Sequence, residues 1–193
     1  MGIHDREHLE VKTTKALKAW LNKNHANSPG LWVVTYKKSA GVAAPTYDEL
    51  VRVALCYGWI DSVPGKVDEL RSKLYFSPRK KGSGWSSSNK KRIKELAAEG
   101  KLKEPGLRVL EAAKKDGSWT KLDKSESVEI PKDLLSAFRK HPGSKRNFDS
   151  FPPGVKKQIL QWIDQARTEP TRLKRITETA SLAAKNVRAH QWR

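Results

Sequence analysis

Apolar residues recur along this 193-residue chain in short periodic segments, and Gly or Pro separates most of these segments from one another. A helix is predicted over residues 13–25, where apolar side chains fall on one face at i, i+4 spacing. Residues 31–38 (LWVVTYKK) are rich in β-branched and aromatic side chains, which predicts a central strand. A capping-box pattern from Thr46 to Glu49 then starts a helix that should end at Gly58.

The middle of the chain predicts two more strands and two more helices. Residues 59–63 and 74–77 suit short strands, and the polar segment between them contains a Pro-Gly pair. The serines after Trp85 can cap a helix that continues to Glu99, with its basic residues facing outward. Another helix is predicted over 105–115, because proline suits the first helical turn.

The pattern of the last third of the chain is wholly helical. Residues 120–130 are polar and lack a period, so they are predicted to form a linker. Three amphipathic segments follow, over 131–141, 153–167 and 170–187, and each opens on a proline at or near the first helical position. They predict a three-helix module over 131–193 that buries its apolar faces mutually or against the first domain.

The fold class expected from this order of elements is α+β. A domain over residues 1–119 should contain a small, mostly antiparallel sheet packed by helices, and the helical C-terminal module should follow it. At 21.8 kDa the chain is long enough for one such domain with a small helical appendage. The pattern leaves the order of the strands open.

The chain is strongly basic, with a formal net charge of +18. Two blocks, residues 66–103 and 132–193, carry almost all of the excess, and a nearly neutral segment lies between them. An excess of this size attracts polyanions such as nucleic acid or an anionic membrane surface. A solvated, solubilising surface explains the same charge equally well.

Candidate chemistry is concentrated between Cys56 and Asn89, where tryptophans, hydroxyl groups, one acid and one arginine come together. An arginine offers a planar pair of donors to a carboxylate or phosphate, and the start of the helix after Trp85 adds free backbone N–H groups. We therefore predict a Trp-lined cleft that binds a small anionic ligand. The residues assigned to this cleft are Trp59, Asp61, Ser77, Arg79, Trp85, Ser86 and Asn89.

Two alternatives stay open at this point. In the first, the central stretch is a buried polar network in which Asp61 pairs with Arg79 and the serines only cap a helix. In the second, the chain binds nucleic acid without sequence preference, because a tryptophan precedes a basic helix and no RNA-recognition signature accompanies it. The basic residues of this second alternative are Lys90, Lys91, Arg92, Lys94, Arg172, Lys174 and Arg175.

Catalysis, cofactors and metals find little support in the sequence. None of the five histidines lies in the central stretch, and H-E-x-x-H, C-x-x-C and Gly-rich phosphate loops are missing. We therefore expect a non-catalytic protein without a cofactor or a metal. The single Cys56 lies in an apolar context, which predicts a buried, inert thiol. No apolar run could span a bilayer and the first residues lack a signal-peptide pattern, so a cytoplasmic protein is expected.

Several short motifs carry a resemblance to a known family. They are W-L at 20–21, L-W-V at 31–33, Y-D-E-L-V at 47–51, A-L-C-Y-G-W-I-D-S at 54–62, S-P-R at 77–79, W-S-x-x-N at 85–89, E-G-K-L at 99–102, A-x-x-D-G-x-W at 113–119, I-P-K-D-L at 130–134, Q-W-I-D-Q-A-R at 161–167 and E-P-T-R-L-K-R-I at 169–176. With them the chain resembles the bacteriocin-protection family of YdeI/OmpD-associated proteins over most of its length.

The resemblance implies a function class rather than a mechanism. The family's name implies a role in surviving bacteriocins and an association with a porin, and no established active site comes with it. Together with the central stretch, this leads us to expect a non-catalytic stress-protection protein that binds a small anionic ligand.

Overall fold

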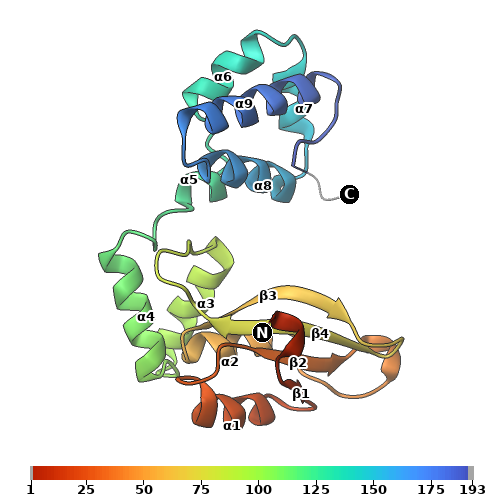
Figure 1. The fold of residues 1–193 in the computed structure, drawn as a ribbon, viewed down its shortest axis with the longest axis vertical. Coiled ribbons are helices and arrows are strands. Elements are labelled where there is room, and N and C mark those ends of the chain that lie inside the picture. Colours follow the sequence, from red (N-terminus) through yellow and green to blue (C-terminus); the bar gives the residue numbers. More distant parts are fainter. Residues whose placement is uncertain (1, 191–193) are drawn as a thin grey trace. The chain divides into compact units, whose positions relative to one another are not determined.

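The structure, a computed structural model, describes residues 2–190 of the chain. Two compact units make up the chain, Met1–Thr120 and Lys121–Arg193, and each of them has its own hydrophobic core. Figure 1 shows strands and helices in the N-terminal unit and helices alone in the C-terminal unit. The α+β class predicted from the sequence is confirmed.

The N-terminal unit is built on a four-stranded sheet with the strand order β1-β2-β4-β3. β2 pairs antiparallel with β4, and β4 pairs antiparallel with β3, whereas the short β1 runs parallel to β2. The strands are β1 (His8–Glu10), β2 (Leu31–Tyr36), β3 (Trp59–Lys66) and β4 (Arg71–Pro78). The sheet is therefore small and mostly antiparallel, as predicted.

The sheet differs from the prediction at β1 and in the lengths of β3 and β4. β1 was not expected, because its three residues are polar or only half-buried and carry no strand signal. Backbone hydrogen bonds next to β1 hold it against β2: the N–H of Trp32 donates to the carbonyl of Glu7, and the N–H of Val11 donates to the carbonyl of Val34. β3 and β4 form one long hairpin, and a register shift between Asp61 and Pro64 marks a bulge in β3.

Four helices and two short 3-10 turns complete the described part of the N-terminal unit. The helices are α1 (Thr14–Asn24), α2 (Tyr47–Cys56), α3 (Ser87–Ala98) and α4 (Glu104–Lys115), and the turns are η1 (Ile3–Asp5) and η2 (Lys38–Ala40). The predicted capping box at the start of α2 is present, with Thr46 and Glu49 bonded to each other's backbone N–H groups. Gly58 follows α2 with a φ of +71°, the left-handed conformation expected after a helix.

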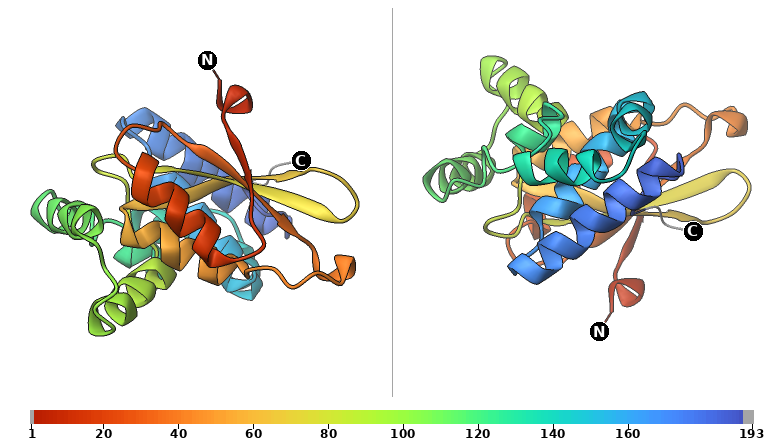
Figure 2. Two further views of the ribbon diagram at one scale, coloured as in Figure 1. Left: turned by 90° about the horizontal axis from the view of Figure 1, so that it is seen from below. Right: turned by 90° about the horizontal axis from the view of Figure 1, so that it is seen from above.

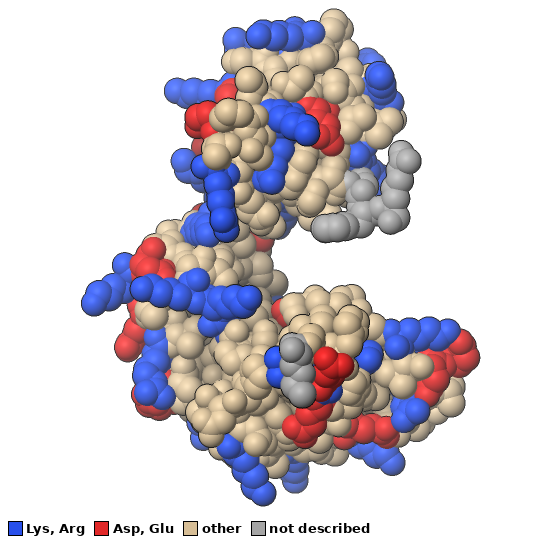
Figure 3. Space-filling model, viewed as in Figure 1, with Lys and Arg blue, Asp and Glu red and all other residues tan. Residues whose placement is uncertain are grey.

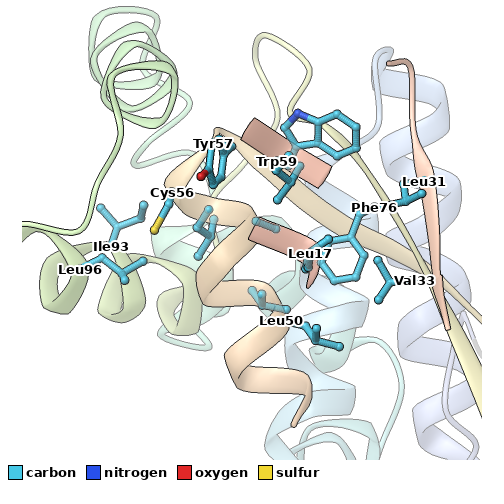
Figure 4. Close-up of a cluster of buried hydrophobic side chains, with 14 of the residues drawn as sticks. Leu17, Leu31, Val33, Leu50, Cys56, Tyr57, Trp59, Phe76, Ile93 and Leu96 are labelled. Atoms are coloured by element: carbon cyan, nitrogen blue, oxygen red, sulfur yellow. The ribbon is translucent and has the colours of Figure 1, made fainter. Parts of the chain in front are cut away.

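The core of the N-terminal unit lies between the sheet and the helices α1 and α2, which pack on the same face of the sheet (Figure 1 and Figure 2). Figure 4 shows Leu17 of α1 and Leu50 of α2 close to Val33 and Phe76 of the sheet. Burying a side chain of this size stabilises the fold by roughly 1.5–3 kcal/mol. Cys56 belongs to the same core, and burial raises the pKa of its thiol, as expected for an inert cysteine.

The described part of the C-terminal unit is wholly helical. Its helices are α5 (Asp123–Glu126), α6 (Lys132–Arg139), α7 (Ser144–Ser150), α8 (Pro153–Asp164) and α9 (Glu169–Ala184). α6, α8 and α9 correspond to the three predicted helices, whereas α5 and α7 were missed. Their apolar faces meet in one core around Leu134, Phe148, Ile159 and Ala180.

The predicted linker, residues 120–130, contains the short helix α5, which was not expected. The hydroxyl of Ser125 donates to the carbonyl of Leu122, and the residue is almost fully buried. A turn that is held by hydrogen bonds from polar side chains to the nearby backbone has no apolar periodicity by which it could be predicted. The predicted module extends to residue 193, and its last three residues lie outside the described part. Between residues 2 and 190, no helix is both long and apolar enough to cross a membrane.

Candidate anion-binding site

Trp59, which the sequence analysis assigned to the wall of a cleft, lies in the hydrophobic core. Its side chain is 1% exposed, and its ring contacts the edge of Trp20 at a centroid distance of 5.6 Å. The indole N–H donates to the carbonyl of His25 over 3.1 Å. The polar atom of this tryptophan is therefore already bonded, and the ring supports packing rather than ligand binding.

Asp61 is also bonded within the protein. Its carboxylate accepts a hydrogen bond from the hydroxyl of Tyr47 over 2.9 Å. Burial and the neighbouring Asp61 together raise the pKa of Tyr47 to about 12, so this hydroxyl keeps its proton. Among the described residues Asp61 forms no salt bridge with Arg79, and the ion pair of the buried-network interpretation is therefore missing.

Arg79 and Trp85 form a direct contact, which makes them the centre of the candidate site. Arg79 follows β4, and its backbone N–H donates to Gly58. The guanidinium carbon lies 3.7 Å from the centroid of the Trp85 ring, and one of its nitrogens donates to the carbonyl of Gly84 over 2.7 Å. Burial lowers the pKa of Arg79 to about 10, although the charge of Asp61 acts in the opposite direction.

The guanidinium of Arg79 is thus partly buried and forms no salt bridge within the described part of the chain, although the charge of Asp61 acts on it. A guanidinium has five N–H donors, and the described contacts give it one protein acceptor. A buried cation is normally paired, because removing a charge from water is costly unless a counter-charge stands close to it. The N–H groups of Arg79 that make no bond to the protein can therefore donate to water or to an anion.

A pocket of about 250 Å³ opens beside this contact. Its lining comes from the loop after β4, from α4 and from the turn that follows α4. The lining residues are Arg79, Lys80, Lys81, Gly82, Ser83, Trp85, Arg108, Val109, Ala112, Ala113, Asp116 and Ser118. Four of them are basic and one is acidic, so the pocket is positively charged.

Asp116, the acidic residue of the pocket, joins the loop to the end of α4. Its carboxylate accepts from the backbone N–H of Ser118 over 2.9 Å and from that of Gly82 over 3.2 Å. These bonds, above all those from Ser118, lower the pKa of Asp116, so its carboxyl group stays ionised. The loop that carries Lys80 and Lys81 is held against α4 in this way.

The remaining predicted cleft residues serve the local fold. Ser86 is the N-cap of α3 and accepts from the backbone N–H of Asn89, while the Asn89 side chain accepts from Arg92. Ser77 is half-buried in β4. Of the seven predicted residues the pocket contains only Arg79 and Trp85. Arg108 and Asp116 were missed, because α4 lies far from the central stretch in the sequence and only the tertiary fold brings it close.

The basic residues of the nucleic-acid alternative are mostly engaged within their own unit. Arg92 pairs with Asp48 at 2.8 Å, and Arg172 pairs with Asp133 at 2.7 Å and with Asp164 at 3.2 Å. Arg175 donates to the carbonyl of Trp162 and lies over its ring, and Lys90 lies over the ring of Trp119. Lys91 is near Glu95. Lys94 and Lys174 are exposed. Figure 3 shows Lys and Arg side chains spread over the viewed face of each unit, with Asp and Glu between them. Nucleic-acid binding stays a prediction.

The fold and the pocket define a basic α+β protein with a helical C-terminal unit and a positively charged pocket in its N-terminal unit. Residues 9–109 match a family described as a domain of unknown function, DUF8412, and residues 127–186 match the family described as bacteriocin-protection, YdeI or OmpD-associated. The first match covers slightly more than half of the chain, so the chain belongs to that family, and the second match lies within its C-terminal unit.

The predicted resemblance to the bacteriocin-protection family is thereby confirmed, through the C-terminal unit. The N-terminal motifs that contributed to it fall in the range of the other family, except A-x-x-D-G-x-W at 113–119, which lies in neither range. Searches of curated proteins and of solved structures found no match to this chain.

Proposed function

We propose that this chain is a non-catalytic protection protein that binds a small anion in the pocket of Arg79 and Trp85, which we call the Arg79 pocket. The observation that carries the proposal is the guanidinium of Arg79, which is partly buried, lies on an aromatic ring and forms no salt bridge with a carboxylate of the described residues. An anion in the pocket would supply the missing counter-charge. Bidentate recognition of a carboxylate or phosphate is the chemistry that such a guanidinium favours.

The surroundings of Arg79 support a compact anion rather than a flat aromatic ligand. One face of Trp85 is covered by Arg79, and Trp119 packs against the ring at a centroid distance of 5.1 Å. Trp85 is only 2% exposed, so it leaves no free ring face for stacking. The exposed Lys80 and Lys81 add charge at the opening, which favours an anion with more than one negative charge, whereas Arg108 is paired with Glu104 at 2.7 Å.

The C-terminal unit connects this proposal to protection, because the family that it matches is named for bacteriocin protection. A protein that binds a small charged molecule can act in such a role without catalysing a reaction. The association with a porin and the cytoplasmic location stay predictions that accompany this proposal.

Intrinsic tryptophan fluorescence tests the proposal directly, because Trp85 contacts the binding group. Orthophosphate, phosphorylated metabolites and di- and tricarboxylates are titrated into the wild type, Arg79→Gln and the control Lys94→Gln. Lys94 is an exposed lysine on α3 outside the pocket. We expect at least one anion to change the emission of the wild type and of Lys94→Gln in a saturable way, with at least ten-fold weaker binding by Arg79→Gln.

Two results would contradict the proposal. One is a wild type whose emission responds to none of these anions at low ionic strength. The other is an anion that binds Arg79→Gln as tightly as the wild type, since binding would then take place elsewhere. Calorimetric titration of the same three proteins with the best anion provides a second readout that does not depend on the tryptophans.

A further inference from the structure

A second pocket lies at the far end of the sheet, where exposed apolar side chains gather. They belong to the segment between β2 and α2, to the first residue of α2 and to the β3–β4 hairpin. These residues, which we call the sheet-end patch, are Val42, Tyr47, Val63, Val67 and Leu70, and each is between 39% and 53% exposed. Of these five, Val42 and Tyr47 line the pocket.

The two segments that carry the sheet-end patch are tied together. Lys37 donates from its ammonium group to the carbonyls of Asp68 and Glu69, over 2.9 Å and 3.1 Å, and its backbone N–H donates to Leu70 over 2.8 Å. In Figure 1 the β3–β4 hairpin and the segment after β2 accordingly reach the same end of the sheet. Hydrogen bonds from Lys37 therefore hold the segment after β2 against the β3–β4 hairpin.

A groove of about 480 Å³ runs between these walls, within the range of roughly 300–1,000 Å³ that is usual for small-molecule sites. Its floor reaches Leu50, a core residue of α2. Its lining residues are Thr35, Tyr36, Lys37, Lys38, Val42, Ala44, Pro45, Thr46, Tyr47, Leu50, Pro64, Gly65, Ser72, Lys73 and Leu74. Six of them have aliphatic or proline side chains, namely Val42, Ala44, Pro45, Leu50, Pro64 and Leu74.

All charged residues that line the groove are positively charged. Its lining contains three lysines and no acidic residue, and none of these lysines forms a salt bridge among the described residues. The ammonium group of Lys73 is directed to Trp32, 4.4 Å from the ring centroid, so it is already occupied. Lys38 is exposed and Lys37 uses only carbonyl partners, which leaves both of them available to an anion at the rim.

We propose that this groove binds one molecule of a dissolved, single-chain anionic amphiphile. The apolar chain would lie against Val42, Pro45 and Leu50, and the anionic headgroup would meet Lys38 and Lys37. The site is separate from the Arg79 pocket, with which it shares no lining residue. The inference therefore does not depend on the function proposed above.

The occupant is a dissolved molecule rather than the surface of an anionic bilayer. Asp68 and Glu69 lie in the hairpin turn beside the patch, where they pair with Arg71 and Lys66. A planar anionic surface that approached Val67 and Leu70 would meet these carboxylates as well as the lysines. A single chain can enter the groove and avoid them.

Calorimetric titration with dodecanoate, below the concentration at which it forms micelles, tests the inference on the full-length chain. The variants are Val42→Asp and Lys38→Glu, both at exposed positions of the groove. The matched control is Leu107→Asp, which places the same charge at an exposed apolar residue of α4 outside the groove. Circular dichroism checks that all variants are folded.

We expect one dodecanoate per chain in the wild type, in Leu107→Asp and in Arg79→Gln, and at least ten-fold weaker binding in Val42→Asp and Lys38→Glu. Dodecyltrimethylammonium, which has the same chain length and the opposite charge, should bind the wild type at least ten-fold more weakly than dodecanoate. Equal binding by the wild type and both groove variants would overturn the inference. Binding to phosphatidylglycerol vesicles without binding to dissolved dodecanoate would overturn it too.

Discussion

Replacing Arg79 by methionine removes a guanidinium that the fold holds against Trp85 without a carboxylate partner. Methionine has a similar length and keeps the apolar contact with the ring. Three effects then compete in the free energy of unfolding. The variant no longer buries a charge, it loses the cation–π contact, and it loses the hydrogen bond to Gly84.

The magnitudes of these effects nearly cancel. The pKa of Arg79 falls to about 10, between two and three pH units below its ordinary value, which at 1.36 kcal/mol per unit corresponds to about 3–4 kcal/mol regained when the charge is removed. A desolvated cation–π contact is worth about 2 kcal/mol, and a hydrogen bond from a charged donor is worth about 1.5–3 kcal/mol. We therefore expect Arg79→Met to lie within about 2 kcal/mol of the wild type.

Urea unfolding followed by tryptophan fluorescence, in a buffer without phosphate or sulfate, measures this difference. The probe suits the question, because Trp20, Trp32, Trp59, Trp85 and Trp119 all belong to the N-terminal unit. A loss of about 3–5 kcal/mol would refute the reasoning, since that is the usual penalty for breaking a buried ion pair. Arg79 would then be a structural residue, and its lack of a counter-charge would have been misjudged.

Two further predictions concern the stability of each unit. A hydrogen bond from Arg172 lowers the pKa of Asp133, so this pair adds stability above the unfolded pKa of about 4 and loses it as the pH falls through the folded value. Asp133→Asn should therefore unfold more easily at pH 7, by up to about 1 kcal/mol, and the difference should vanish once the pH is below the folded pKa of Asp133. A difference that does not depend on pH would contradict this. Gly106→Ala should lower stability by roughly 1–3 kcal/mol, because its Cβ would lie 2.5 Å from the carbonyl oxygen of Cys56. The control Gly154→Ala meets nothing within 4 Å and should be neutral or stabilising in thermal unfolding, so equal losses in the two variants would exclude the steric explanation.

Most elements with local signals could be predicted from the sequence. The helices α2, α8 and α9 carry a capping box or a proline in the first turn, and both signals describe bonds made within a few residues. β1 and α7 lack such signals. β1 exists because β2 offers it a backbone partner, and α7 is held by Phe148, which packs between Phe138 and Phe151.

The candidate site could be predicted only in part, because some of its residues come together only in the tertiary fold. Arg79 and Trp85 are six positions apart, and a short loop lets them touch, so their sequence neighbourhood was informative. Trp59 lies 20 positions before Arg79 in the same stretch, and its position on β3 directs it into the core. A tryptophan that packs and a tryptophan that binds look alike in a sequence. The contribution of α4 depends on how the helix lies against the loop, which no local pattern encodes.

The two edges of the sheet have a consequence for how this protein behaves in concentrated solution. β1 offers an approaching strand only three residues, and the other edge, β3, is interrupted by the bulge before Pro64, which has no N–H group. Neither edge presents a long, regular row of free backbone donors and acceptors, the feature through which sheets of separate molecules join. Resistance to strand-mediated aggregation is therefore built into the backbone, and it should persist in high salt, where the repulsion between strongly basic chains is screened.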